Sequence, residues 1–499
     1  MTDTSAPFSD SGPSKIAKSG AAEATGEALG SKGIGWAVFE WARNPYYNVI
    51  VIYVFAPYFA NYIAGGGAAG QATVADTIKI AGMAMAILAP LLGLIVDKGG
   101  GKKSFIFVSL AVLGICSLGL GYITPDFPNA VTIGMTLMIV GYCAYTVSEI
   151  LHNSILPAAG KPAALPMISG LGLAFGNVAG VIMLLVLLAA NVLMPIVTET
   201  TGGIGVYSGP IVAFWLAVFI IPFFILMPDR RGSLGSWPAS IKQTFTPPNF
   251  KLWGSGSPFN YVWSMPINSA LFVISKFKES PNVMRYLAAR MIYADGMAVL
   301  LTLGGVYVAG VLGWSATEVI IYGITGSLLG ALGGIVGGAL DGRLGPKNAL
   351  IVELIAIIII LFVQVSVTQD SLFFGLVASG QDIWTGFGTG LFTSLSDVFY
   401  FLMVIPAGIA IVSCISSSRY MLVHISPPER IGEFFGFYAM AGSITVWIGP
   451  LIVSEMTTAF DDQRIGFSGV AILFVIGLLI LLTVKADKTP EHMKPVPRR

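Results

Sequence analysis

The segment Gly93-Leu-Ile-Val-Asp97-Lys98-Gly-Gly-Gly-Lys102-Lys103 has a second copy in the same chain, Gly338-Ala-Leu-Asp341-Gly-Arg343-Leu-Gly345-Pro-Lys347. The aspartates of the two copies are 244 residues apart in a chain of 499 residues. Each copy lies between two long apolar runs, so the two halves of the chain look duplicated. An aspartate at a helix end, beside a glycine turn and cations, can form charge-assisted hydrogen bonds across a seam between helix bundles.

The repeated motif therefore predicts a latch that holds one conformation and is released in another. The alternative is a plain turn whose lysines and arginine serve only as topology signals. Two further acids lie near the same predicted membrane boundary, where a solvated or latch position suits them better than substrate binding. The candidate latch residues are Gly93, Asp97, Lys98, Lys102, Asp341, Arg343, Glu149 and Glu353.

The composition identifies a membrane protein. Only 11% of the residues are charged, whereas soluble globular proteins carry roughly 25%. A net charge of +1 disfavours nucleic-acid binding, because no excess of cations can displace phosphate counterions. The three cysteines lie in apolar runs, and the three histidines are too scattered to predict a metal site. No catalytic or phosphate-binding motif occurs, so we expect neither an enzyme nor a cofactor.

Twelve apolar runs are long enough to cross the hydrocarbon core, which takes about 20 helical residues. They are continuously apolar, without the alternation of a β-barrel strand. The expected fold class is an all-α polytopic membrane protein with 12 transmembrane helices in two pseudo-symmetric six-helix bundles. The runs cover residues 35–62, 76–96, 104–123, 129–150, 165–190, 210–227, 286–311, 316–340, 348–367, 398–418, 433–455 and 464–484.

Polar intervals between these runs predict the domain organisation. The outer loop contains the short apolar segment 372–378, for which a re-entrant or surface lid and a disordered loop remain open. The predicted parts are a disordered tail (1–33), an N-terminal bundle (34–228), a central loop (229–285), a C-terminal bundle (286–484) with a long outer loop at 368–397, and a tail (485–499).

The cations predict the orientation. Of the 27 Lys and Arg residues, 23 fall in tails and loops on one side of the predicted membrane, whereas the opposite loops hold none in their interiors. The positive-inside rule places that side, with both termini, in the cytoplasm. We expect a monomer in a bacterial inner (plasma) membrane.

Charged residues inside the first span of each half are candidates for transport. A charge at mid-membrane costs at least about 2.5–3.5 kcal/mol, so its retention suggests a function. Glu40 and Arg43 are three residues apart and share a helix face. Asn44 follows, and Pro45 removes a backbone donor and frees carbonyls. The alternative is that Glu40 and Arg43 extend to the cytoplasmic interface.

The second half begins with an equivalent charged segment. Arg290 and Asp295 lie about 140° apart on a helix and should not pair with each other. Pairing across the two halves, Glu40 with Arg290 or Arg43 with Asp295, would neutralise all four charges. Tyr293 could donate a hydrogen bond to a substrate or simply pack. The candidate substrate or proton-coupling residues are Glu40, Arg43, Asn44, Arg290, Tyr293 and Asp295.

Glycine stripes predict close helix packing. One stripe lies in the fifth span and the other in the eighth, and two interpretations are open: sliding surfaces or static contacts. The stripe residues are Gly172, Gly176, Gly180, Gly326, Gly330 and Gly334.

Three motifs, with the repeated loop, resemble the vacuole-effluxer-like branch of the major facilitator superfamily. The chain departs from this family's pattern in having Glu40 where Asp is usual, Arg43 where Asn is usual, and a longer 368–397 loop. The motifs are Phe39-Glu40-Trp41-Ala42-Arg43-Asn44-Pro45-Tyr46, Ala289-Arg290-Met-Ile-Tyr293-Ala-Asp295-Gly296 and Glu433-Phe434-Phe435-Gly436-Phe437-Tyr438.

This resemblance implies a secondary active transporter that moves a small solute by alternating access, with the fifth and eighth spans meeting between the halves. It also implies an amino acid as substrate and efflux as a direction, and a carboxylate at Glu40 or Asp295 could carry a coupled proton, as in a symporter or antiporter. The alternative is a non-transporting membrane sensor or scaffold that kept the fold. The expected partners are a small-molecule substrate, the lipid bilayer and protons.

Overall fold

The structure is a computed structural model. It describes residues 30–98, 102–161, 164–194, 202–227, 275–379, 390–427, 430–431, 434–435, 437–438, 442 and 445–486. Three of the predicted parts lie mostly outside these ranges: the central loop and the two tails. The outer loop is outside them at 380–389.

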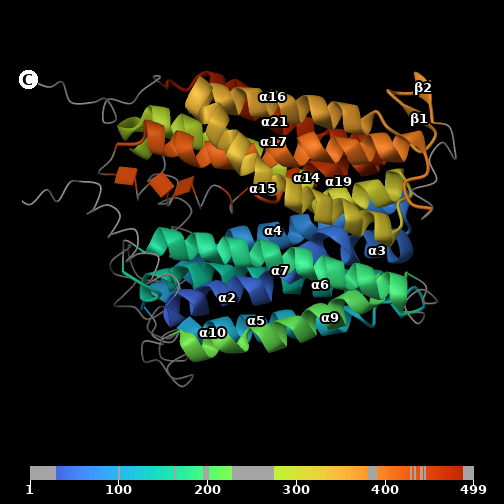
Figure 1. The fold of residues 1–499 in the computed structure, drawn as a ribbon, viewed down its shortest axis with the longest axis horizontal. Helices are drawn as coiled ribbons and strands as arrows, with labels where there is room; N and C mark the ends of the chain where they lie inside the picture. Colours follow the sequence, from blue (N-terminus) through green and yellow to red (C-terminus); the bar gives the residue numbers. More distant parts are fainter. Residues whose placement is uncertain are drawn as a thin grey trace, which may run out of the picture.

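The helices form two bundles whose axes run along the length of the molecule (Figure 1). The N-terminal bundle consists of α2 (Ser31–Tyr46), η1 (Tyr47–Tyr53), α3 (Phe55–Tyr58), η2 (Phe59–Ile63), α4 (Gly67–Lys98), α5 (Lys102–Leu120), α6 (Ala130–Ser154), η3 (Leu156–Ala158), α7 (Leu165–Leu193), α9 (Ile204–Phe219) and α10 (Ile221–Leu226). The C-terminal bundle consists of α14 (Pro281–Val311), α15 (Ala316–Leu344), α16 (Pro346–Val365), α17 (Leu395–Ile425), α19 (Ile448–Phe460), α20 (Gln463–Ser468) and α21 (Val470–Leu482).

Ten helical segments in the described ranges are long and apolar enough to cross a membrane. The run 35–62 is divided among α2, η1, α3 and η2. The run 433–455 lies partly outside the described residues, and the short apolar helix α19 begins within it. The arrangement is consistent with the predicted 12 spans.

The first span changes its helical geometry after a proline. Pro45 lies in the last turn of α2, and the chain continues as the π-helix η1. Because Pro45 has no N–H group, the carbonyl of Trp41 lacks its normal intrahelical partner. The indole Nε1 of Trp215 in α9 donates to this carbonyl at 3.0 Å. The carbonyl freed by the proline is therefore used for helix packing.

The apolar segment of the outer loop forms a small β hairpin. β1 (Ser371–Leu372) pairs antiparallel with β2 (Val377–Ala378), with Ser371 opposite Ala378 and Leu372 opposite Val377. The turn places Gly375 at φ +93°, a conformation that glycine adopts without steric cost. The predicted lid or disordered loop is thus an ordered hairpin at 371–378. We call this end of the molecule the hairpin face and the opposite end, where α2 begins and α21 ends, the terminal face (Figure 1).

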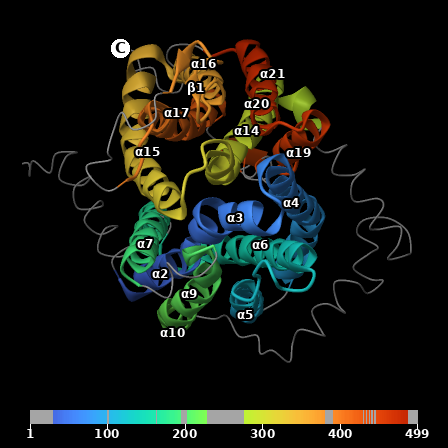
Figure 2. The same cartoon turned by 90° about the vertical axis from the view of Figure 1, so that its right-hand side faces the viewer.

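Contacts between the bundles are concentrated toward the hairpin face. Seen from that face, α4 lies beside α19 and α7 lies beside α15 (Figure 2). Gln71 in α4 donates to the Thr457 hydroxyl and to the Gln463 carbonyl, both at 2.9 Å. Asn191 in α7 donates to the Thr317 hydroxyl of α15, also at 2.9 Å. These bonds close the seam at one end of the molecule.

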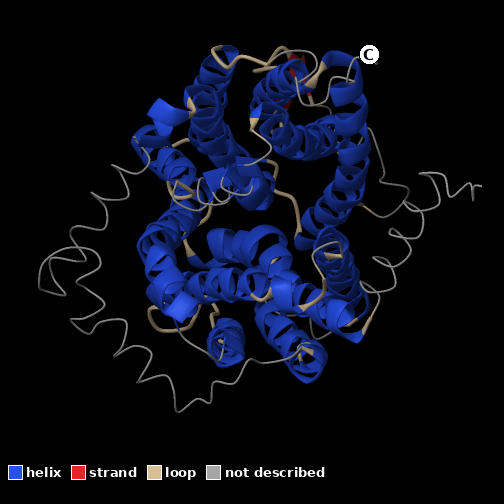
Figure 3. Cartoon of the chain, turned by 90° about the vertical axis from the view of Figure 1, so that its left-hand side faces the viewer, coloured by secondary structure: helices blue, strands red, loops and turns tan. Residues whose placement is uncertain are grey.

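The view from the terminal face shows the same two groups of helices (Figure 3). There, the described cations bond within their own bundles. Lys103 Nζ donates to the carbonyls of Phe224 and Met227 at 2.8 and 2.5 Å. Lys347 Nζ donates to the Leu482 carbonyl at 3.0 Å. The helix ends are tied to their neighbours rather than to the opposite bundle.

The glycine stripe of the fifth span packs inside its own bundle. A Cβ added at Gly172 would lie 2.6 Å from the Trp36 ring, and one at Gly180 would lie 1.8 Å from the Asn48 amide. The stripe in α7 therefore faces α2 and η1. The helices α7 and α15 do meet, but outside this stripe. The bulky side chains on α2 and η1 allow a close approach of α7 only where the face of α7 consists of glycines.

The glycine stripe of the eighth span also packs against a helix of its own bundle. Gly330 in α15 faces Val412 of α17 at 3.0 Å, whereas Gly334 has no atom within 4 Å of an added Cβ. The closer approach is made one residue earlier, at Gly333, where an added Cβ would lie 2.6 Å from the Ile409 carbonyl oxygen. A Cβ added at Gly326 would lie 3.8 Å from Val404 of α17 and 4.0 Å from the Tyr53 hydroxyl of the N-terminal bundle. The closest contacts of both stripes are thus within bundles, and the eighth-span stripe approaches the opposite bundle only at Gly326.

Neighbouring glycines in α15 provide a test of this packing. Gly333→Ala should destabilise the protein by about 1–3 kcal/mol, because the methyl group would press on the α17 backbone. Gly334→Ala is the matched control. It adds the same methyl group in open space and should leave the melting temperature unchanged or slightly raised. Thermal unfolding of the purified variants measures the difference, and equal melting temperatures would contradict the packing.

Candidate functional site

A buried ion-pair cluster links α2 to α6. The Arg43 guanidinium, which is 2% exposed, contacts the Glu40 carboxylate at 2.8 Å and the Glu149 carboxylate at 3.2 Å. It also donates to the Tyr145 carbonyl at 3.3 Å. The predicted shared face of Glu40 and Arg43 is therefore present. Their predicted extension to the cytoplasmic interface is wrong for Arg43, whose charge is satisfied inside the bundle.

His152 completes this group, which we call the Arg43 cluster (Glu40, Arg43, Glu149 and His152). Its ring is stacked between Trp36 and Phe39, with centroid distances of 4.1 and 3.9 Å. Nε2 lies 2.9 Å from the Trp36 carbonyl, and Nδ1 lies 3.4 Å from Glu40 Oε1. A carbonyl only accepts, so Nε2 carries a proton. Nδ1 has no hydrogen-bond partner among the described residues, so the two stacked rings and the bond at Nε2 hold the His152 side chain.

The charges of the Arg43 cluster follow from this geometry. Glu40 is the more buried partner of Arg43, whereas Glu149 remains 44% exposed and solvated. The buried Arg43–Glu40 pair is neutral, which is the favoured state in a low-dielectric helix bundle. The cluster therefore anchors α2 on α6.

Tyrosines extend from the Arg43 cluster toward the C-terminal bundle. The Arg43 guanidinium lies over the Tyr145 ring, 4.1 Å from its centroid. Tyr145 stacks on Tyr47 at 5.7 Å and lies 6.4 Å from the Tyr142 ring. Tyr142 in turn lies within electrostatic range of Asp295 on α14. The tyrosines therefore separate Arg43 from Asp295.

Asp295 lies at the seam with one carboxylate oxygen unpaired. Its side chain is 5% exposed, and the Gly449 backbone N–H of α19 donates to it. Oδ2 has no hydrogen-bond partner among the described residues. The hypothesis that Arg43 pairs with Asp295 is wrong for this conformation, because Arg43 is held by two carboxylates of its own bundle.

Arg290 is held inside the C-terminal bundle. It donates to the Tyr438 carbonyl at 2.6 Å, and its guanidinium lies 3.4 Å from the centroid of the Tyr438 ring. The Tyr438 hydroxyl bonds to Ser418 at 2.8 Å. The hypothesis that Glu40 pairs with Arg290 is therefore also wrong for this conformation. Tyr293 is fully buried beside these residues.

Asn44 connects α2 to two other helices. Its amide donates to the Gly176 carbonyl of α7 at 2.8 Å, and its carbonyl oxygen accepts from the Tyr145 hydroxyl at 3.4 Å. The polar side chain is satisfied within the N-terminal bundle. Asn44 therefore positions Tyr145 beneath Arg43.

The candidate latch residues are dispersed. Gly93, Asp97 and Lys98 lie outside the described side chains. Lys102 donates to the Ser154 carbonyl at 3.3 Å, and Arg343 is exposed. Asp341 is buried in its own bundle. The latch remains a prediction, since none of these contacts crosses the seam.

The two acids predicted near the boundary have different surroundings. Glu149 belongs to the Arg43 cluster and remains 44% exposed. Glu353 is 2% exposed and accepts hydrogen bonds from serines of α17. The solvated interpretation of Glu353 is therefore wrong, because α16 turns this residue toward the bundle interior.

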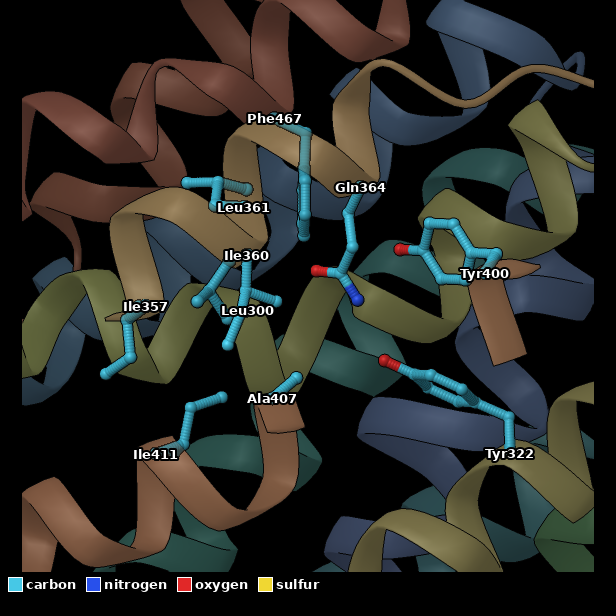
Figure 4. A pocket seen from close by; sticks show the side chains of 10 residues that line it. All are labelled: Leu300, Tyr322, Ile357, Ile360, Leu361, Gln364, Tyr400, Ala407, Ile411 and Phe467. Carbon is cyan, nitrogen blue, oxygen red and sulfur yellow. The ribbon is translucent and has the colours of Figure 1, made fainter. Parts of the chain in front are cut away.

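A separate cavity lies within the C-terminal bundle, toward the hairpin face. The hydroxyl groups of Tyr400 and Tyr322 point toward the Gln364 amide, and most of the other lining side chains are aliphatic (Figure 4). None of the predicted site residues lines it. Its lining residues are Leu300, Tyr322, Ile357, Ile360, Leu361, Gln364, Tyr400, Ala407, Ile411 and Phe467.

The partners that surround the predicted charges are not among the predicted site residues. His152 is one of them, although its spacing of three from Glu149 places both on one helix face. Tyr142 and Tyr145 have the same spacing. These i, i+3 spacings are sequence features that predict a shared helix face. For Tyr438, the only such feature is the motif that contains it.

Two helix bundles with buried charges near their seam define a polytopic membrane transport protein. The chain belongs to the family described as vacuole effluxer Atg22 like, whose model matches residues 164–494, about two thirds of its length. It is a transporter of the major facilitator type. The predicted family and fold are confirmed.

Individual relatives agree with this assignment. The chain is 22% identical over 466 residues to the uncharacterized MFS-type transporter YxiO of Bacillus subtilis (strain 168), covering 91% of this chain and 95% of that protein. Among solved structures, it resembles a mutant of the nucleoside transporter NupG, with a TM-score of 0.59 and 14% identity, covering 91% of this chain and 99% of the other. It also resembles the D-xylose-proton symporter, with a TM-score of 0.58 and 12% identity, covering 91% and 98%.

A third solved structure is similar in fold. The bacterial homolog of the human lysosomal transporter Spinster, in an inward-facing and unoccupied conformation, gives a TM-score of 0.55 at 13% identity, covering 92% of this chain and 96% of that one. At these identities the solved structures establish the fold alone. The substrate has to be argued from the residues of this chain.

The two carboxylates around Arg43 provide a test of the cluster. Glu40→Gln should destabilise the protein by about 3 kcal/mol, because it leaves a buried guanidinium and His152 without their shared partner. Glu149→Gln is the matched variant. It alters the more exposed carboxylate and should cost less than about 1 kcal/mol. Thermal unfolding in one detergent compares them, and a larger loss for Glu149→Gln would contradict the assigned geometry.

Proposed function

We propose that the protein is a secondary active transporter that exports an amino acid by alternating access, coupled to protons. The observation that carries the proposal is Asp295. It is a buried carboxylate with an oxygen that is unpaired among the described residues, placed on the first helix of the C-terminal bundle and within electrostatic range of Tyr142 of the N-terminal bundle. A carboxylate at such a seam can gain or lose a proton as the seam opens and closes.

The polar groups near Asp295 suit a zwitterionic solute. Arg290 retains a guanidinium on the same helix, and its bonds to Tyr438 leave other N–H groups for a substrate carboxylate. Asp295 offers a negative charge to a substrate ammonium group. These two groups, with Tyr142 opposite, support an amino acid as the substrate.

The conformation corresponds to one of the two states of an alternating-access cycle. Two hydrogen bonds close the seam at the hairpin face, one from Gln71 to Thr457 and one from Asn191 to Thr317. The positive-inside rule places the terminal face in the cytoplasm. We therefore assign this state as closed to the outside, with the protein a monomer in the cell membrane. The cytoplasmic latch would form in the opposite state.

A non-transporting sensor or scaffold is the second candidate. The observation that favours it is the burial of Arg43 and Asp295, which are only 2% and 5% exposed. A sensor that kept the fold needs no water-filled path to these residues. The two candidates differ in whether the seam at the hairpin face opens.

The proton role of Asp295 has a direct test. Asp295→Asn should lower gradient-driven transport at least tenfold and leave exchange partly intact, because exchange needs no net proton movement. Proteoliposomes would be loaded with the amino acid that most raises the melting temperature in a screen, since a bound ligand stabilises the folded state. Asp126→Asn, in an exposed loop, is the control. An unchanged pH dependence in both Asp295→Asn and Glu40→Gln would refute proton coupling.

Opening at the hairpin face can be tested with a cross-link. The Asn191 amide and the Thr317 hydroxyl are 2.9 Å apart, so Asn191→Cys with Thr317→Cys should form a disulfide. The background would carry Ala at the three native cysteines, Cys116, Cys143 and Cys414. Oxidation should stop transport and reduction should restore it.

Each single-cysteine variant is the control for the cross-link and should transport equally well with oxidant or reductant. Full transport in a completely cross-linked sample would exclude alternating access at this face. No transport before cross-linking, with a folded protein and every amino acid tried, would favour the sensor.

A further inference from the structure

Glu353 lies in the C-terminal bundle without a cationic partner. It is on α16, is 2% exposed, and its Oε1 accepts hydrogen bonds from the hydroxyls of Ser413 and Ser417, the latter at 2.9 Å. The serines are four residues apart and so share one face of α17. Two helices are thus joined through one carboxylate oxygen.

A second carboxylate approaches the same serines from α15. Asp341 is 9% exposed and interacts with the Ser417 hydroxyl and with His424. Glu353 Oε2 and Asp341 Oδ1 are both buried and have no hydrogen-bond partner among the described residues. We call the group of Glu353, Asp341, Ser413 and Ser417 the Glu353 site.

The surroundings supply little positive charge. On α17, Cys414 adjoins Glu353, and His424 is near Asp341. On α14, Arg290 lies near Cys414 but is bonded to Tyr438. The helix α21, which also packs on α16, contains no titratable side chain, and Arg464 of α20 is paired with Asp462 at 3.0 Å.

The buried carboxylates of the two bundles have different partners. The carboxylates of the Arg43 cluster face a guanidinium, whereas those of the Glu353 site face hydroxyl groups. Two neighbouring carboxylates in an apolar interior cannot both be ionised without a large cost, and one bound proton removes it. Among the described residues, no group of three or more His, Cys, Asp or Glu side chains is placed to hold a metal ion.

We propose that the Glu353 site is a proton-binding site inside the C-terminal bundle, in which one proton is held on Glu353 Oε2 or Asp341 Oδ1. It is separate from Asp295 and does not depend on the proposed function. Protons reach it from the terminal face, because Asp341 is near the end of α15 and His424 near the end of α17. On the other side, Ile357 and Leu361 separate Glu353 from the cavity of Figure 4.

Infrared spectroscopy of the full-length protein in lipid tests this site, because a protonated carboxyl group has a carbonyl band that a carboxylate lacks. We expect such a band at neutral pH, absent in Glu353→Gln. Raising the pH should remove it and lowering the pH should restore it. Asp295→Asn, which removes the other buried acid with an oxygen unpaired among the described residues, is the matched comparison and should retain the band. Its loss in Asp295→Asn would assign the proton to the seam and overturn the proposal.

The serines provide a second variant that keeps both acids. Ser413→Ala with Ser417→Ala should shift the band to higher frequency, because the carbonyl oxygen loses two hydrogen bonds. This result would support the site even where Glu353→Gln does not fold. A band that is absent at every pH, or unaffected by the serine and Glu353 variants, would overturn the proposal. Loss of the band when sodium chloride replaces choline chloride at constant pH would identify a metal site instead.

Discussion

The Arg43 guanidinium, buried in hydrocarbon-spanning helices, is the constraint on which the N-terminal bundle depends. An unpaired charge there is costly, so α2 must approach α6 closely enough for Glu40 and Glu149 to neutralise it. The same approach brings Tyr145 beneath the guanidinium and stacks His152 between aromatic rings. Helix position and aromatic packing thus follow from one charge.

The two bundles meet the same electrostatic problem in different ways. In the N-terminal bundle an arginine compensates two acids, and the geometry of its planar fork fixes both partners. In the C-terminal bundle Arg290 is bonded to Tyr438, and the acids at 341 and 353 have serine hydroxyls instead. Duplication of the fold therefore did not preserve the distribution of charge, and the halves differ in what a proton can do in each.

The sequence predicted the fold well, because hydrophobic run length and the location of lysine and arginine are direct consequences of the bilayer. The twelve apolar runs, the two halves and the family followed from such features and from short motifs. The interruption at η1 and the hairpin at 371–378 did not. Both depend on tertiary contacts. An example is the hydrogen bond that the Trp215 indole donates to the backbone carbonyl left without a partner by Pro45.

The site was predicted less completely, for a reason that particular residues show. Glu40, Arg43 and Asp295 were found because a charge in an apolar run stands out. Their partners are serines, tyrosines and a histidine, which are unremarkable in sequence and gain meaning only when helices meet. The seam pairs expected from symmetry were wrong because local partners on α6 and near Tyr438 lie closer than the opposite bundle.

The closed seam has a consequence for how the molecule can move. The hydrogen bonds from Gln71 to Thr457 and from Asn191 to Thr317 join neutral side chains near the hairpin face, and such bonds contribute only about 0.5–1.5 kcal/mol each. The contact between α4 and α19 also includes charged groups, because Ser454 donates to Asp76 and Lys79 lies 3.7 Å from the Glu455 carboxylate. The Arg43 cluster lies within one bundle and need not be broken when the bundles separate. A rigid-body motion that opens the seam therefore keeps the buried Arg43 charge paired, while it changes the surroundings of the acids at the seam, Asp76, Glu455 and Asp295.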